Sequence, residues 1–125
     1  MTKVLIVEDN DAFRTMFAGL LRSSFPFLDV AEARDGDEAL MAVGRECPDV
    51  IFMDVRLPGA NGLDLTRKIK RAYRDTVVAV MSNFDMPEYR DAALRNGAVR
   101  FIVKDSSALE MLDLVQSILE EHRLL

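Results

Sequence analysis

Short apolar runs alternate with amphipathic segments along the whole chain. Four of these runs are almost continuously apolar, which is typical of strands that are buried on both faces of a sheet. They lie at residues 3–7, 49–53, 77–81 and 99–103. A fifth run, 27–33, contains Asp29 and Glu32, and these charges favour a strand at the sheet edge. Strands that alternate with helices imply parallel pairing through right-handed crossovers.

The segments between the runs show helical spacing. After the first run, apolar residues recur at i, i+3, i+4, i+7 and i+8 from Phe13, which is the pattern of one helical face. Asn10 or Asp11 can cap this helix at its N-terminus. Four later helices are predicted near residues 37–43, 65–73, 87–96 and 107–119. The chain therefore reads as five strand–helix units, and its 125 residues fit one domain.

The overall composition narrows the class of protein. A net charge of −5 argues against nucleic-acid binding by this domain alone, because phosphate contacts need a basic face. Cys47 is the only cysteine, so no intrachain disulfide can form, which fits a reducing cytosol. The N-terminus lacks a signal-peptide pattern and no apolar stretch reaches membrane-spanning length. We therefore expect a cytoplasmic protein that contacts neither nucleic acid nor membrane.

Polar residues follow the ends of the four apolar runs. Glu8 and Asp9 follow the first run, and Asp54 follows the run at 49–53. Ser82 and Lys104 follow the last two. In open parallel sheets, ligands bind beyond the carboxyl ends of the strands. We therefore expect three carboxylates, a hydroxyl and an ammonium group to meet at one edge of the sheet.

This combination of groups suggests phosphoryl transfer. Three carboxylates suit Mg²⁺, which takes few protein oxygens, and a metal would offset the repulsion that raises carboxylate pKa values. Asp54 could then attack a phosphoryl group while Lys104 stabilises its oxygens. Each of these residues alone has an ordinary alternative, such as a turn former, a helix cap or a solvated surface group. The prediction depends on all four strand ends together.

The chain resembles the receiver domains of two-component response regulators, which take a phosphoryl group from a histidine kinase. The resemblance covers Lys3 to about Leu119 and rests on three motifs. They are Val4–Asn10 (VLIVEDN), Asp49–Asp54 (DVIFMD) with Leu57-Pro58-Gly59 and Gly62, and Asn96-Gly97-Ala98 with Phe101 and Lys104. The family implies a single receiver domain over residues 1–125. Its α/β fold would be flavodoxin-like, a doubly wound (βα)5 with a parallel five-stranded sheet in the order 2-1-3-4-5.

The resemblance also implies roles for individual residues. Asp54 would be the phosphoacceptor and Lys104 would contact the phosphoryl group. Ser82 would be the switch hydroxyl, and Phe101 the aromatic switch. The ligands of Mg²⁺ would be Glu8, Asp9, Asp54 and the backbone carbonyl of Arg56. The domain would transfer phosphate only to itself and lose it again, so we do not expect an enzyme with a separate substrate.

Two positions near the site depart from the family pattern, and two others are expected to affect how fast the phosphoryl group is hydrolysed. Asn83 stands where a small residue usually follows the switch hydroxyl, and Asp105 replaces a proline after Lys104. A cis bond before a non-proline residue costs about 3 kcal/mol, so we expect this bond to be trans or strained. Arg56 and Phe84 flank the path of a hydrolytic water, and neither orients water as an acid or amide does. We therefore expect a longer phosphoryl half-life than in relatives with such groups.

Phosphorylation is expected to switch the surface formed by the fourth helix, the fifth strand and the fifth helix. The expected phosphodonor is a histidine kinase or a phosphotransfer protein. Candidate partners beyond it are a second copy, bound through this surface or the last helix, and an effector domain C-terminal to the chain. The apolar stripe of the last helix, 111–119, is wider than one buried face needs, which fits either a contact role or an end-of-domain helix with a few exposed apolar residues.

Three other functions remain open. A degenerate receiver would serve only as an interaction module, but it would be expected to have lost the acidic, acceptor and lysine positions. An aspartate-nucleophile phosphohydrolase normally carries its nucleophile after the first strand, in an acidic pair spaced by one residue, whereas Glu8 and Asp9 are adjacent. A flavodoxin-like cofactor binder would need a Gly-rich or Ser/Thr-rich phosphate loop after the first strand, and none is present.

Overall fold

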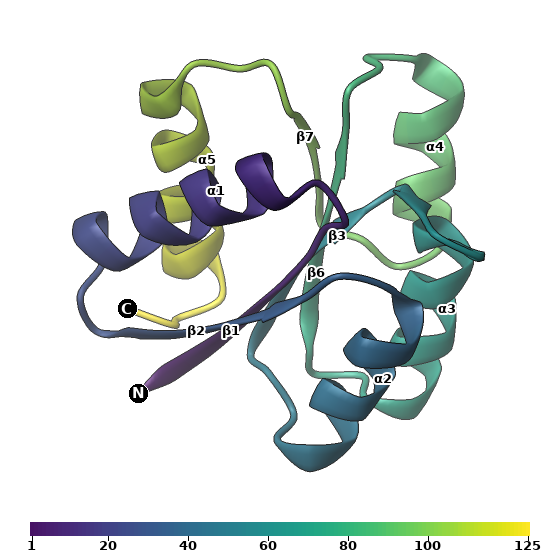
Figure 1. Ribbon diagram of the computed structural model, residues 1–125, viewed down its shortest axis with the longest axis horizontal. Helices are drawn as coiled ribbons and strands as arrows, with labels where there is room; N and C mark the ends of the chain where they lie inside the picture. The colour runs from purple at the N-terminus through teal and green to yellow at the C-terminus, as the bar shows by residue number, and fades with distance from the viewer.

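A five-stranded parallel sheet forms the centre of the protein in the computed structural model, which describes residues 1–125 (Figure 1). Its strands are β1 (Thr2–Val7), β2 (Leu28–Ala33), β3 (Val50–Asp54), β6 (Val77–Ser82) and β7 (Arg100–Val103). They lie in the order β2-β1-β3-β6-β7, and all four neighbouring pairs are parallel. The predicted order and the predicted edge strand 27–33 are both confirmed.

Helices cover both faces of the sheet. They are α1 (Asp11–Ser24), α2 (Gly36–Arg45), α3 (Gly62–Ala72), α4 (Pro87–Arg95) and α5 (Ala108–Glu121). Helices α1 and α5 lie on one face, and α2, α3 and α4 lie on the other (Figure 1). Successive strand residues point to opposite faces, so Val4 of β1 packs toward α1 and α5 while Leu5 packs toward the other layer. The fold is therefore doubly wound.

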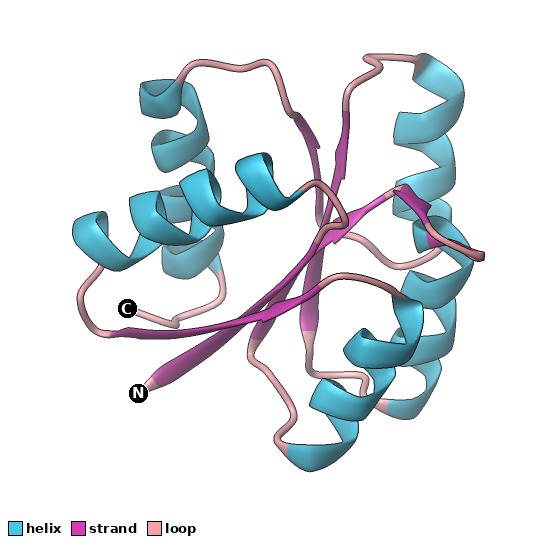
Figure 2. Cartoon of the chain, viewed as in Figure 1, coloured by secondary structure: helices cyan, strands magenta, loops and turns pink.

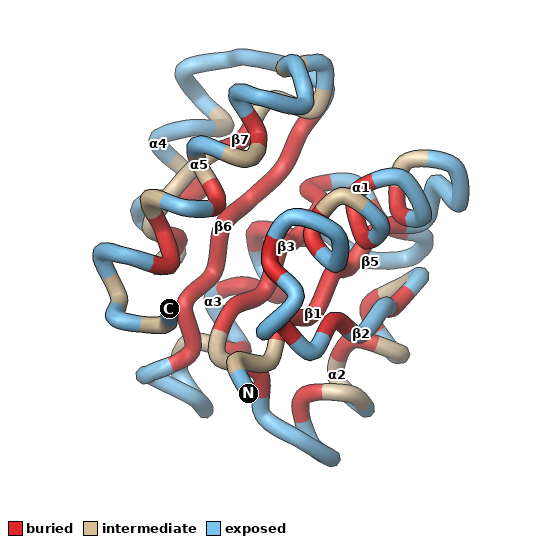
Figure 3. Tube along the Cα trace, turned by 90° about the vertical axis from the view of Figure 1, so that its left-hand side faces the viewer, coloured by how far each residue is buried: buried red, intermediate tan, exposed pale blue.

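The two apolar layers bury the central strands almost completely. Figure 3 shows buried residues running along β1, β3 and β6. In one layer, the rings of Phe17 and Phe52 meet edge to face at 5.1 Å, and both side chains are fully buried. In the other layer, the side chain of Ile69 of α3 is also almost completely buried. Such burial holds the strand ends in fixed positions relative to one another.

Most of the wide apolar stripe of α5 packs within the domain. Met111, Val115, Ile118 and Leu119 are all buried in the layer between α1 and the sheet. Leu109 is the strongly exposed apolar residue of this helix, at 70%. Leu112 and Leu114 of the same stripe are only half-buried, so the role of this helix as a contact surface stays a prediction.

Side-chain caps fix where four of the five helices begin, and α4 instead begins at Pro87 without a side-chain cap. Of the two candidates for α1, Asn10 is the cap, because its side chain accepts the Phe13 N–H at 2.9 Å.

A feature that was not predicted is a small antiparallel ladder, β4 (Arg56–Leu57) with β5 (Ala60–Asn61), which follows Asp54. None of the helices combines the length and the apolar character needed to cross a membrane.

Candidate functional site

The predicted site residues do meet at the carboxyl edge of the sheet. Glu8 follows β1, Asp54 ends β3, Ser82 ends β6 and Lys104 follows β7. These four strands are neighbours in the sheet, so their ends lie side by side. Figure 2 shows that a loop follows β1, β6 and β7 before the next helix begins, whereas the short strands β4 and β5 lie between β3 and α3. The sheet therefore supplies the rigid frame, and the loops carry the chemical groups.

Three carboxylates form the acidic part of the site. Glu8, Asp9 and Asp54 each offer an oxygen, and these oxygens lie within 4.8 Å of one another. Glu8 and Asp54 are buried, whereas Asp9 is exposed. Burial, with a further contribution from the charge of Glu8, raises the pKa of Asp54 to about 7, although Lys104 opposes the shift. The site therefore holds more negative charge than its single lysine compensates.

Lys104 supplies that positive charge from the end of β7. Its ammonium group forms an ion pair with Glu8 and lies 3.5 Å from Asp54 Oδ1. The ring of Phe13 covers it, with 4.7 Å between Nζ and the ring centroid. The Lys104 N–H donates to the Ser82 carbonyl at 2.8 Å. No peptide bond in the chain is cis, so of the two forms expected for Lys104–Asp105 the trans form is present.

Ser82 ends β6, and the three predicted tuning residues, Arg56, Asn83 and Phe84, lie on the segments that follow β3 and β6. The Ser82 hydroxyl is buried and accepts the Phe84 N–H at 3.0 Å. The guanidinium of Arg56 lies over the exposed Phe84 ring, 4.9 Å from its centroid. Asn83 is exposed on the loop that follows Ser82. The proposed role of the Arg56 carbonyl as a metal ligand stays a prediction.

Phe101 lies on β7 next to α4. It is half-buried against the layer formed by α2, α3 and α4. The guanidinium of Arg90 stacks on its ring at 5.0 Å and also pairs with Asp85 at 2.5 Å. The aromatic side chain is therefore connected to the loop that follows Ser82.

One residue of the site region was missed by sequence reasoning. Arg14 of α1 is buried, and its Nη1 donates to the backbone carbonyl of Glu8 at 2.8 Å. The sequence carries one signal for it, since Arg14 stands inside the apolar stripe that begins at Phe13, where a charged residue needs a partner.

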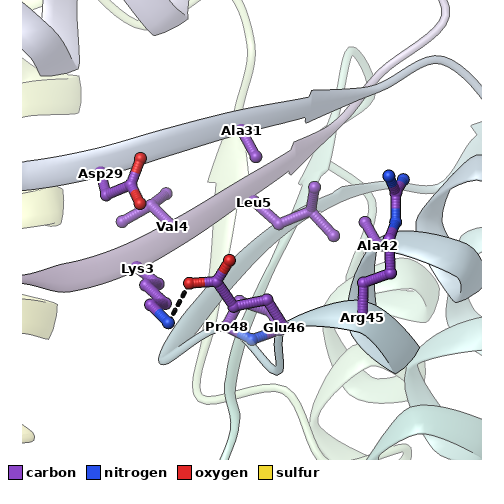
Figure 4. A pocket seen from close by; sticks show the side chains of 9 residues that line it. All are labelled: Lys3, Val4, Leu5, Asp29, Ala31, Ala42, Arg45, Glu46 and Pro48. Atoms are coloured by element: carbon purple, nitrogen blue, oxygen red, sulfur yellow. Dashed lines mark ion pairs between the residues drawn. The ribbon is translucent and has the colours of Figure 1, made fainter.

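A pocket of about 250 Å³ lies away from the site, at the amino-terminal half of β1 (Figure 4). Lys3, Val4 and Leu5 form one wall, and the end of α2 forms another. Lys3 forms an ion pair with Glu46 across its mouth (Figure 4). The pocket contains none of the predicted site residues, so it does not compete with the acidic cluster as the functional centre.

Known proteins match both the sequence and this architecture. The family model of the response regulator receiver domain matches residues 4–116. The response regulator GacA of Pseudomonas syringae pv. syringae (strain B728a) is 31% identical over 123 residues, which cover 98% of this chain and 58% of that protein. The oxygen regulatory protein NreC of Staphylococcus haemolyticus (strain JCSC1435) is 34% identical over 117 residues, covering 93% of this chain and 54% of that protein.

A solved structure agrees with the same assignment. The signal receiver domain of the putative response regulator NarL from Mycobacterium tuberculosis superimposes with a TM-score of 0.84 at 31% identity, covering 95% of this chain and 96% of that chain. The chain spans about half the length of the curated relatives that it matches. Because the family model covers residues 4–116 and the sheet order is the one that the motifs predicted, the chain belongs to the response regulator receiver domain family of two-component signalling systems.

Proposed function

We propose that Asp54 accepts a phosphoryl group from a histidine kinase or a phosphotransfer protein in the cytoplasm. The observation that supports this role is the surroundings of Asp54. It lies buried at the end of β3, with Lys104 3.5 Å away and the carboxylates of Glu8 and Asp9 beside it. A nucleophilic carboxylate, a cation for the phosphoryl oxygens and a metal-binding acid pair are the groups that phosphoryl transfer needs.

The acidic cluster fits Mg²⁺. Three carboxylate oxygens lie within 4.8 Å of one another, in a site where burial and the charge of Glu8 raise the pKa of Asp54, and they form a hard-oxygen donor set for a cation. Glu8, Asp9 and Asp54 would hold the ion together with the Arg56 carbonyl. When bound, the ion offsets the negative charge that gathers on the phosphoryl oxygens.

In the proposed reaction, a carboxylate oxygen of Asp54 forms a bond to the phosphorus of a phosphohistidine. The P–N bond breaks, the electron pair leaves with the imidazole, and an acyl phosphate remains on Asp54. Lys104, now paired with Glu8, can turn its ammonium group to a phosphoryl oxygen. The hydroxyl of Ser82, which now accepts the Phe84 N–H, can donate to another.

Loss of the phosphoryl group would require a water in line with the new bond. The stacked side chains of Arg56 and Phe84 lie in the loops beside Asp54 and offer no carboxylate or amide to orient that water. This contact supports slow self-hydrolysis, and hence a long-lived signal rather than enzymatic turnover. The domain would act on a second copy or on an effector domain through the surface of α4, β7 and α5.

The experiment is phosphoryl uptake from acetyl phosphate, measured by intact mass. We expect the parent to gain one phosphoryl group in Mg²⁺ and none in EDTA, because the acids cannot then be neutralised. Asp54→Ala should gain none under either condition. Asp113→Ala, which removes an exposed carboxylate of α5, should behave as the parent. Uptake by Asp54→Ala, or no uptake by the parent in Mg²⁺, would refute the proposal.

A further inference from the structure

Arg14 is buried in α1 although its charge is permanent. Three of its N–H groups have partners within the chain. Nη1 donates to the Glu8 carbonyl at 2.8 Å, Nε to Glu32 Oε1 at 3.2 Å, and Nη2 to Asp11 Oδ1 at 2.5 Å. A guanidinium taken out of water is costly unless its donors are satisfied. The planar fork of Arg14 therefore sits in a fixed orientation between β1, β2 and α1.

The orientation of the Glu8 carbonyl affects the conformation of the metal-binding loop. It belongs to the peptide group that joins Glu8 to Asp9, so its orientation sets the direction in which Asp9 leaves β1. On either side of it, the Glu8 N–H donates to the Ala33 carbonyl at 2.9 Å, and Glu8 Oε2 accepts the Asn10 N–H at 3.1 Å. Asp9 itself is exposed. Its position therefore depends on how this peptide group is held.

Glu32 ties Arg14 to the edge strand. The Glu32 carboxylate on β2 also pairs with Arg22, at 3.3 Å from Nη2. Arg22 thus shares the same carboxylate and the same helix as Arg14, but its hydrogen bonds go to β2 and not to the loop at residues 8–10. This difference makes Arg22 a matched control, since its removal takes away one positive charge without touching the Glu8 carbonyl.

We propose that Arg14 is a positioning residue for the divalent cation. Its hydrogen bond to the Glu8 carbonyl presets the peptide group so that Asp9 can join Glu8 and Asp54 around Mg²⁺. The inference rests on the Mg²⁺ site proposed above. Loss of an outer-shell partner of this kind weakens metal binding by roughly 10–100-fold. Charge alone acts in the opposite direction, because a nearby guanidinium repels Mg²⁺ and its removal would tighten binding.

The test is a Mg²⁺ titration of the full chain, followed by the amide resonances of Asp9 and Asn10 at constant ionic strength. For Arg14→Met we expect the dissociation constant to rise about tenfold. Arg22→Met should bind within about twofold of the parent, or more tightly, because it removes a half-exposed charge and no hydrogen bond to the loop at residues 8–10. Binding by Arg14→Met that is as tight as the parent's, or tighter, would overturn the inference.

A second variant covers the case in which Arg14→Met does not fold, which urea denaturation would reveal. Arg14→Lys keeps the positive charge but loses the planar fork, and it should weaken Mg²⁺ binding by about threefold or more relative to Arg22→Lys. Equal binding by these two variants would also overturn the inference. A parent that does not bind Mg²⁺ refutes the proposed site itself, whereas a binding parent with unaffected Arg14 variants refutes only the positioning role.

Discussion

Asp54 lies where its negative charge is poorly solvated. Burial is the largest cause and the charge of Glu8 the next, and together they raise the pKa of Asp54 from 3.8 to about 7. Between these two pH values the folded state holds a proton that the unfolded chain releases. The free energy of unfolding of the metal-free protein therefore falls as pH rises through this range, and the stabilising contribution of the protonated form is lost above it.

Asp54→Asn should remove the free-energy cost of burying the Asp54 charge, because the amide is nearly isosteric and uncharged. At about pH 8 in EDTA, we expect the free energy of unfolding of the variant to be about 1–2 kcal/mol above that of the parent. A pKa shift corresponds to roughly 1.4 kcal/mol of stability per pKa unit, and solvent at the open side of the site screens part of this amount. Urea denaturation at about pH 5 and pH 8 measures the effect. Asp113→Asn should leave the pH dependence of the parent unchanged. An Asp54→Asn variant that loses as much stability as the parent between the two pH values would contradict the explanation.

The start of α3 holds the backbone of Asp54 in place. The Gly62 N–H donates to the Val55 carbonyl at 2.7 Å, just after the β4–β5 ladder has turned the chain back. Gly62 approaches so closely that a Cβ there would lie 1.9 Å from the Asp54 carbonyl oxygen. Only glycine permits this contact, so the helix start and the nucleophile are positioned together.

Gly62→Ala should therefore destabilise the fold by about 3 kcal/mol, because backbone rather than a flexible side chain must move. Gly19→Ala is the matched control. Gly19 lies inside α1, where an added Cβ would meet no atom within 4 Å, and alanine there should stabilise the helix by about 0.5–1 kcal/mol. Urea denaturation of both variants measures these changes in the free energy of unfolding, which should be a decrease for Gly62→Ala and an increase for Gly19→Ala. A Gly62→Ala protein as stable as the parent would show that the loop relaxes freely.

Local pattern was enough to predict the strands, and with them most of the site. Glu8, Asp54, Ser82 and Lys104 could be placed because each follows an apolar run, and parallel strands bring their ends to one edge. The β4–β5 ladder could not be predicted, since two-residue strands have no readable periodicity.

For Arg14, local pattern could mark a charge within an apolar stripe but could not identify its partners. Its partner Glu32 lies 18 residues away on another strand, so its burial depends on tertiary contact. The stripe of α5 is a similar case, because how much of its width is buried could be judged only against the surfaces that cover it. Patterns within one element predict which face is apolar, but the neighbouring elements decide how much of that face is buried.

A connected set of contacts links Ser82, at the end of the strand next to Asp54, to α4 and β7. Ser82 holds the Phe84 N–H, and the same loop carries Asp85, which pairs with Arg90 of α4. Arg90 in turn stacks on Phe101 of β7. If phosphorylation draws the Ser82 hydroxyl toward Asp54, the Phe84 N–H loses its acceptor and the loop must adjust. Both α4 and Phe101 are then free to shift, which biases the α4–β7–α5 surface between two states.

Beryllofluoride with Mg²⁺, which stands in for the phosphoryl group on Asp54, tests this relay by amide chemical shifts. We expect changes across residues 83–103 in the parent, and little change in α2 (Gly36–Arg45), which lies outside the relay. Ser82→Ala should confine the changes to the segments around residues 8–10 and 54–62, because the mimic still binds but the hydroxyl that moves the loop is gone. The same confinement in the parent would mean that Asp54 is modified without switching the surface. Changes across 83–103 that persist in Ser82→Ala would mean that the signal leaves Asp54 by another route, with Lys104 after β7 the remaining charged contact.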